Sequence, residues 1–168
     1  TSADYDGWRQ RGCVGWDWDS VLTYFKKAEN QARGASDLHG VGGPLHVSDT
    51  PSRSELADAM IAAAEGLGIP RTDDFNGPRQ DGAGYYQTTT ARSRRWSTAK
   101  AYLEPARARA NLVVRPDCQA TRVVFEGNRA IGVEIRSPGG PRTARARGEV
   151  IVSSDEPVLY DQLKPRLL

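Results

Sequence analysis

The sequence predicts an α+β protein in which helices pack on a mainly antiparallel sheet. Two observations lead to this fold class. The first half of the chain has segments with apolar residues at helical spacing, and the second half has consecutive strand-like runs separated by turn residues. A length of 168 residues is enough for one compact core, or for one and part of a second. We therefore expect helices first and a β-meander after them.

Two amphipathic helices are predicted in the first half. Residues 17–30 place Val21 and Phe25 on one arc, with charged residues on the opposite arc. A second helix is expected to begin at Ser52, because residues 52–55 have the S-x-x-E form of a capping box, and to stop before Pro70. The apolar residues predicted to form its buried stripe are Leu56, Met60, Ile61, Ala64 and Leu67.

Short elements are expected between this helix pair and the second half of the chain. A glycine-rich loop at 33–49 enters a short strand at 45–47, and a β-favouring run follows at 85–90. A short helix is predicted at 98–103. Pro105 is expected to limit it, because the residue before a proline is pushed away from helical geometry.

Four extended runs are predicted after Pro105, at 111–115, 119–125, 130–136 and 143–153. The residues between the second and third runs, Glu-Gly-Asn-Arg, are typical of a tight turn. We expect the first three runs to form an antiparallel meander.

Composition and charge exclude several classes of protein. A net charge of only +2 argues against a nucleic-acid binder, and no apolar run approaches the roughly 20 residues of a membrane span. The arginine clusters at 92–95 and 142–147 could contact phosphates, but solvated faces explain them better. Cys13 and Cys118 lie far apart without a metal-binding neighbourhood, which predicts free thiols. With no secretory signal visible, we expect a cytoplasmic location.

The familiar catalytic motifs are absent from the residues. The chain has no G-x-G-x-x-G dinucleotide fingerprint, P-loop, G-x-S-x-G elbow or H-E-x-x-H helix. Only His39 and His46 could carry protons near neutral pH, and both lie in the glycine-rich stretch, which is not expected to hold them rigidly. Asp73-Asp74 and Asp155-Glu156 are interpreted as caps and turns. No catalytic residue and no metal ligand is assigned.

Several segments, in order and almost without gaps from 4 to 153, resemble the glucose–methanol–choline (GMC) oxidoreductase family, in particular its choline dehydrogenase-like members. The segments that carry the resemblance are Tyr5-Asp6-Gly7-Trp8, Gly15-Trp16-Asp17-Trp18, His39-Gly40-Val41-Gly42-Gly43-Pro44-Leu45, Asp74-Phe75-Asn76-Gly77, Gln80-Asp81-Gly82-Ala83-Gly84-Tyr85-Tyr86-Gln87, Arg95-Trp96-Ser97-Thr98-Ala99-Lys100-Ala101-Tyr102-Leu103, Asn111-Leu112-Val113-Val114, Ala120-Thr121-Arg122-Val123-Val124-Phe125-Glu126-Gly127 and Ala130-Ile131-Gly132-Val133-Glu134.

The resemblance implies an internal segment of a two-domain flavoprotein. Residues 1–110 would belong to the substrate domain, 111–153 would form the β-meander and returning strand of the FAD side, and 154–168 would be a divergent tail. In the family, the residue that matches Ala120 contacts the adenine end of FAD through backbone atoms. The family usually has valine there. Ala120 is the single cofactor-binding residue that the resemblance implies.

The resemblance also implies the activity of the parent enzyme, which is oxidation of a CH–OH group of a small-molecule alcohol with hydride transfer to FAD. The family's glycine fingerprint and histidine motif are not in this chain, so we expect the isolated chain to be inactive. The alternatives are a stand-alone binding or assembly module and a truncated fragment. Apolar faces at 112–114 and 150–152 would favour a homo-oligomer or a complementing chain. The sequence does not identify the alcohol.

Overall fold

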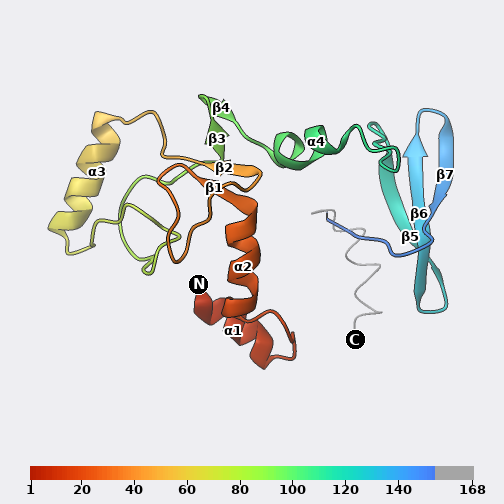
Figure 1. Ribbon diagram of the computed structural model, residues 1–168, viewed down its shortest axis with the longest axis horizontal. Coiled ribbons are helices and arrows are strands. Elements are labelled where there is room, and N and C mark those ends of the chain that lie inside the picture. The colour runs from red at the N-terminus through yellow and green to blue at the C-terminus, as the bar shows by residue number, and fades with distance from the viewer. Residues whose placement is uncertain (154–168) are drawn as a thin grey trace. The chain divides into compact units, whose positions relative to one another are not determined.

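The computed structural model describes residues 1–153 (Figure 1). The chain divides into two compact units, residues Thr1–Leu112 and the residues from Val113 on. The divergent tail expected at 154–168 lies outside the described residues. The model has both helices and antiparallel sheets, which confirms the predicted α+β class.

Two helices open the first unit. The first, α1 (Ser2–Gln10), was not predicted, because its sequence has no continuous apolar stripe and none of its side chains is buried. The second, α2 (Trp18–Ala28), confirms the predicted amphipathic helix. The carboxylate of Asp17 caps it by accepting the amide N–H of Ser20 at 3.1 Å. The helix ends at Ala28, two residues before the predicted limit, because Glu29 already has extended geometry.

A two-stranded parallel sheet follows, formed by β1 (Glu29–Gln31) and β2 (Leu45–Val47). The strand at 45–47 is therefore confirmed. Its partner β1 was not predicted, because the first two residues of β1 were assigned to the end of the predicted helix. The connecting loop passes so close to the end of α2 that a Cβ atom at Gly40 would collide with the carbonyl oxygen of Lys26. Glycine is required there because only its backbone can approach another backbone so closely.

The third helix, α3 (Glu55–Gly66), begins three residues later than the predicted start at Ser52. Ser54 is the N-cap, and its hydroxyl accepts the amide N–H of Ala57 at 3.1 Å. The predicted stripe is also wrong in large part, because Ile61 is buried while Leu56, Met60 and Leu67 are 73%, 66% and 83% exposed. Within the described residues, nothing covers that face of the helix.

A hairpin of β3 (Thr90–Ala91) and β4 (Arg94–Arg95) follows. The strand expected at 85–90 is wrong except at its end, where Thr88 forms one bridge with Ser48 and Thr90 enters β3. The helix expected at 98–103 is a π-helical turn, Ala99–Leu103, and it continues as α4 (Glu104–Ala106). Pro105 does not end it, since it occupies the first turn of α4, where a missing N–H is tolerated.

The second unit contains an antiparallel meander of β5 (Gln119–Glu126), β6 (Arg129–Ser137) and β7 (Gly140–Arg145), in that order. The runs at 119–125 and 130–136 and the turn between them are confirmed. The strand predicted at 111–115 is wrong, and the run at 143–153 is extended only as far as Arg145. The meander is therefore closed by β7, because β7 finds hydrogen-bonding partners along β6.

The described part of the chain has a small core. Its buried hydrophobic side chains are Val21, Ile61, Ala101 and Val123. No helix within residues 1–153 is long and apolar enough to cross a membrane. Both cysteines are free, as predicted. Among the described side chains, no group of three or more histidine, cysteine or carboxylate residues is arranged to hold a metal ion.

Candidate functional site

The short strand β1 separates two polar sites. Side chains alternate across a strand, so Glu29 and Gln31 point to one side and Asn30 to the other. Glu29 and Gln31 contact His39, whereas Asn30 contacts His46. Each of the two histidines therefore lies on its own side of β1.

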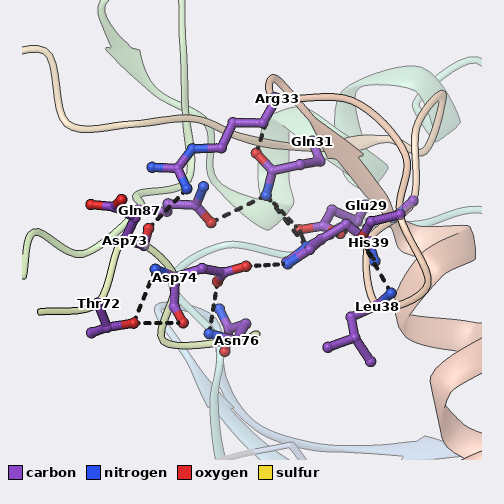
Figure 2. Close-up of polar contacts among 12 residues, drawn as sticks. Glu29, Gln31, Arg33, Leu38, His39, Thr72, Asp73, Asp74, Asn76 and Gln87 are labelled. Atoms are coloured by element: carbon purple, nitrogen blue, oxygen red, sulfur yellow. Dashed lines mark hydrogen bonds and ion pairs between the residues drawn. The ribbon is translucent and has the colours of Figure 1, made fainter. Parts of the chain in front are cut away.

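The first site is the His39 cluster, which consists of Glu29, His39 and Asp74 (Figure 2). His39 Nδ1 lies 2.9 Å from Glu29 Oε2, and His39 Nε2 lies 2.8 Å from Asp74 Oδ2. The His39 residue is only 8% exposed. Both ring nitrogens thus face carboxylates in a partly buried site, and they can donate to both only when the ring is the doubly protonated imidazolium.

The electrostatic balance of the cluster agrees with this protonation state. Burial by itself lowers the pKa of His39, but the hydrogen bonds to Glu29 and Asp74, with their negative charges, outweigh burial and raise the pKa above its ordinary value. Gln31 Nε2 is 3.4 Å from His39 Nδ1, a pairing of two N–H donors that cannot form a hydrogen bond when the ring is protonated. The two carboxylates therefore favour the protonated, cationic form of His39.

The remaining oxygens of both carboxylates also have partners. Glu29 Oε1 accepts the side-chain amide of Gln31 at 3.3 Å, and Glu29 Oε2, which also faces His39, accepts the amide N–H of Gly40 at 3.0 Å. Asp74 Oδ1 accepts the amide N–H of Asn76 at 2.9 Å. Such full pairing is what makes a buried ionic cluster tolerable, because each unpaired lone pair would add a desolvation cost.

A second ionic contact lies next to the cluster. Arg33 donates to the carbonyl oxygen of Asp73 at 2.8 Å and forms an ion pair with Asp49 at 2.7 Å. The hydrogen bond from Arg33 is the main reason that the pKa of Asp49 is lowered. Together with the His39 cluster, this contact ties β1 to segments about 20 and 40 residues further along the chain.

The His39 cluster acts as a structural clasp, and while its ring is protonated His39 cannot serve as a general base. A general base needs a free lone pair, and neither nitrogen of the imidazolium has one. This placement corrects the expectation that the glycine-rich stretch does not hold His39 rigidly. The sequence carries no local signal for the cluster, because its members are separated by 10 and 35 residues. Asp74 was interpreted as a turn residue, and it also has that role through Asn76.

The second site surrounds His46, which lies inside β2 and is also held firmly. Asn30 Oδ1 accepts the amide N–H of Gly42 at 2.9 Å, which fixes the orientation of the Asn30 amide. Asn30 Nδ2 therefore donates to His46 Nδ1 at 3.0 Å, and the proton of the neutral ring must be on Nε2. The indole of Trp96 packs edge-to-face on the ring at 4.7 Å, and its N–H donates to the carbonyl oxygen of Pro44.

Ala120, the residue expected to contact FAD, lies in the second unit near the start of β5. It is half-buried and pairs with Ile135 of β6. The register shifts between Ala120 and Arg122, so the strand is irregular there, and the hydroxyl of Thr121 donates to the carbonyl oxygen of Glu134 at 3.2 Å. The role of Ala120 remains a prediction.

The described residues do not by themselves form a site for FAD. A dinucleotide cradle needs a glycine-rich turn between a strand and a helix, so that backbone N–H groups meet the pyrophosphate. No described helix of the chain follows a strand through such a turn. Ala120 would supply one backbone contact at most, and no chemical step through a flavin can be derived from this chain.

Comparison with known proteins gives a consistent result. The family model described as GMC oxidoreductase matches residues 1–156. The chain is 43% identical over 152 residues to an oxygen-dependent choline dehydrogenase of Sinorhizobium fredii, covering 90% of this chain and 27% of the relative. It is 42% identical over 150 residues to the human mitochondrial choline dehydrogenase, covering 89% of this chain and 25% of the relative. The chain thus spans about a quarter of the length of these relatives.

Solved structures agree on the fold. The crystal structure of pyridoxine 4-oxidase from Mesorbium loti superposes with a TM-score of 0.74 at 28% identity, covering 86% of this chain and 29% of that chain. An FAD-dependent oxidoreductase from Chaetomium thermophilum superposes with a TM-score of 0.75 at 22% identity, covering 87% of this chain and 28% of that chain. The second similarity concerns the fold alone.

Proposed function

Because this chain belongs to the GMC oxidoreductase family, we propose that it is the part of an FAD-dependent enzyme that forms the framework beside the substrate and supports the adenine end of the cofactor. The reaction would be oxidation of a CH–OH group of a small-molecule alcohol. FAD supplies the hydride acceptor when it is bound. Two relatives are named as choline dehydrogenases, which makes choline the first alcohol to test.

One observation carries the assignment of a framework role. His39 has both ring nitrogens on carboxylates, and His46 carries its proton on the nitrogen that is not bonded to Asn30. Neither histidine of the chain has a lone pair free to accept the proton of an alcohol. The base would therefore come from polypeptide outside this chain, and the residues described here would set the geometry of the loops around it.

The cofactor contact is proposed at Ala120. Its position on β5, at the irregularity in the strand, supports a contact made by backbone atoms rather than by the methyl group. FAD binding by this chain alone is not expected, because the contacts with the pyrophosphate would have to come from elsewhere in the enzyme.

Complementation tests this function. The chain is mixed with a second polypeptide that carries the family's glycine fingerprint and histidine motif, and alcohol-dependent dye reduction is measured with choline and other primary alcohols. We expect activity only with both polypeptides and FAD. If the mixture stays inactive and colourless while the chain captures an unrelated protein, the binding-module alternative is favoured instead.

Variants of Ala120 test the contact separately. In the complemented enzyme, Ala120→Val should keep FAD affinity within about threefold, because a backbone contact survives a small change of side chain. Ala120→Trp should weaken FAD binding at least about tenfold by blocking the approach of the adenine. Ala144→Trp, at an exposed position of β7, is the matched control. Equal FAD affinity for both tryptophan variants would contradict the assignment.

A further inference from the structure

A pocket in the first unit has a composition that the framework role does not explain. We call it the His46 pocket; it lies between β2 and the β3–β4 hairpin, elements that are adjacent in Figure 1 and joined by the Ser48–Thr88 bridge. Its lining includes the apolar side chains of Ala32, Val47 and Ala91, together with His46, Arg92 and Trp96. No carboxylate is among the residues that line it.

The lining also includes Asn30, Ser48 and Thr90, whose side chains already form hydrogen bonds within the structure. His46 Nε2 carries a proton because Nδ1 accepts from Asn30, and this N–H has no partner within the described residues. Trp96 is fixed in place by its hydrogen bond to Pro44 and by its contact with the His46 ring. The pocket therefore offers one oriented N–H donor beside a fixed aromatic ring.

The hairpin adds positive charge. The guanidinium groups of Arg92, Arg94 and Arg95 are exposed, and none of them forms an ion pair or side-chain hydrogen bond with any described residue. Arg92 lines the pocket itself. An unpaired guanidinium next to a donor and without competing carboxylates favours an anionic ligand.

The backbone at Arg92 is a second, independent observation. Arg92 and Ser93 have φ values of 51° and 59°, in the left-handed region that two-residue hairpin turns require and that asparagine and glycine normally fill. An arginine there has an energetic cost, and residues held in such conformations concentrate at functional sites. The large side chain of Arg92 thus occupies a backbone conformation that disfavours it.

From these features we propose that the His46 pocket binds a small carboxylate with an apolar, preferably aromatic, body. Arg92 would pair with the carboxylate, His46 Nε2–H would donate to it, and the body would lie against Trp96, Val47 and Ala91. The inference concerns a ligand site in this chain and does not depend on the proposed oxidoreductase activity.

The test uses the 168-residue chain and benzoate as the probe. The chain has two histidines, so a His39→Gln variant assigns the ring NMR signals that belong to His46. We expect benzoate to shift the His46 signals saturably. Benzamide, which has the same body without the charge, and inorganic phosphate, which has the charge without the body, should each bind at least about tenfold more weakly.

Substitutions complete the test. Arg92→Gly removes the guanidinium but suits the backbone, so the hairpin should be retained while benzoate affinity falls at least about tenfold. Arg145→Gln, at an exposed arginine of β7, is the matched control and should leave the affinity unchanged. Unchanged affinity in Arg92→Gly, equal binding of benzoate and benzamide, or equal binding of benzoate and phosphate would each overturn the proposal, as would shifts that do not saturate.

Discussion

At the scale of single residues, His39 shows how a side chain that usually suggests catalysis can serve the fold. It is bonded on both sides to carboxylates, at 2.9 and 2.8 Å, and it is nearly buried. Removal of the imidazolium would leave the two carboxylates close together without their common partner. The resulting loss of folding free energy exceeds what the intact ion pairs contribute to stability. The residue therefore matters to stability more than to proton transfer.

We predict that His39→Ala lowers the free energy of unfolding by about 2–4 kcal/mol, because two partly buried carboxylates lose their common partner. Urea unfolding monitored by circular dichroism measures the change. His46→Gln is the matched control, since it removes a histidine that has one neutral hydrogen-bonding partner. An equal loss in both variants would contradict the clasp.

The raised pKa of His39 also predicts how stability depends on pH. The folded state holds the proton more tightly than the unfolded state, so this contribution is fully present below the ordinary histidine pKa of about 6.5. It is lost as pH rises through the folded-state value. Urea unfolding at several pH values should show stability falling as pH rises across this window, and His39→Gln should flatten that fall. An identical slope in the variant would rule out His39 as the source.

Ser93 gives a second prediction at this scale. Its φ of 59° is unfavourable for serine and easy for glycine. Ser93→Gly should raise the free energy of unfolding by about 0.5–1 kcal/mol, measured by thermal unfolding. Ser52→Gly is the control, because Ser52 is exposed and its φ is not positive. An equal increase in the free energy of unfolding for Ser52→Gly and Ser93→Gly would contradict the explanation by the positive φ of Ser93.

At the scale of elements, the loop between β1 and β2 depends on close backbone contact with α2. A Cβ atom added at Gly40 would collide with the carbonyl oxygen of Lys26. One added at Gly43 would lie 2.5 Å from the carbonyl carbon of Ala28. The same close contact between the loop and α2 positions His39, which is one residue before Gly40. The glycines of this stretch thus allow the clasp to form.

We therefore predict that Gly40→Ala is strongly destabilising, by about 2–4 kcal/mol, because the loop must move away from α2 and the His39 cluster must open. Gly66→Ala is the matched control, since Gly66 lies at the end of α3 with open space around it. It should be neutral or slightly stabilising. Comparable unfolding midpoints for the two variants would argue against the close approach.

At the scale of the whole molecule, several large hydrophobic side chains are exposed, among them three in the second unit. Val113, Val114 and Ile151 are 71%, 46% and 81% exposed. Surfaces of this kind usually pack against other protein. This chain spans about a quarter of its relatives, so in proteins of their length further polypeptide is available to cover such surfaces.

The isolated chain should therefore self-associate. Light scattering at increasing concentration should show a mass above that of the 18.4 kDa monomer. The double variant Val113→Lys with Ile151→Lys should shift the chain towards monomer, because charged side chains oppose apolar contact. Val14→Lys, at an 87% exposed position of the first unit, is the control. A monomer at every concentration would contradict the prediction.

The sequence alone determined the elements with strong local signals. The strands at 119–125 and 130–136 with their turn, helix α2 and the short strand at 45–47 were predicted, because periodicity and turn residues act within a few positions. The order of family-like segments identified the family, which the GMC model confirms over residues 1–156. The prediction failed at 111–115, because a strand-like sequence forms a strand only when a neighbouring strand pairs with it. It also failed in α3, because the apolar stripe was expected to be buried and is mostly exposed.

The tertiary structure alone decided what the histidines do. Glu29, His39 and Asp74 are separated by 10 and 35 residues, and no local pattern indicates that a carboxylate will meet each ring nitrogen. The same is true of the His46 pocket, which needs β2 and the β3–β4 hairpin side by side. Local preferences act over a few residues along the chain, whereas charge pairing and burial depend on distances in space, which are set only when the chain folds.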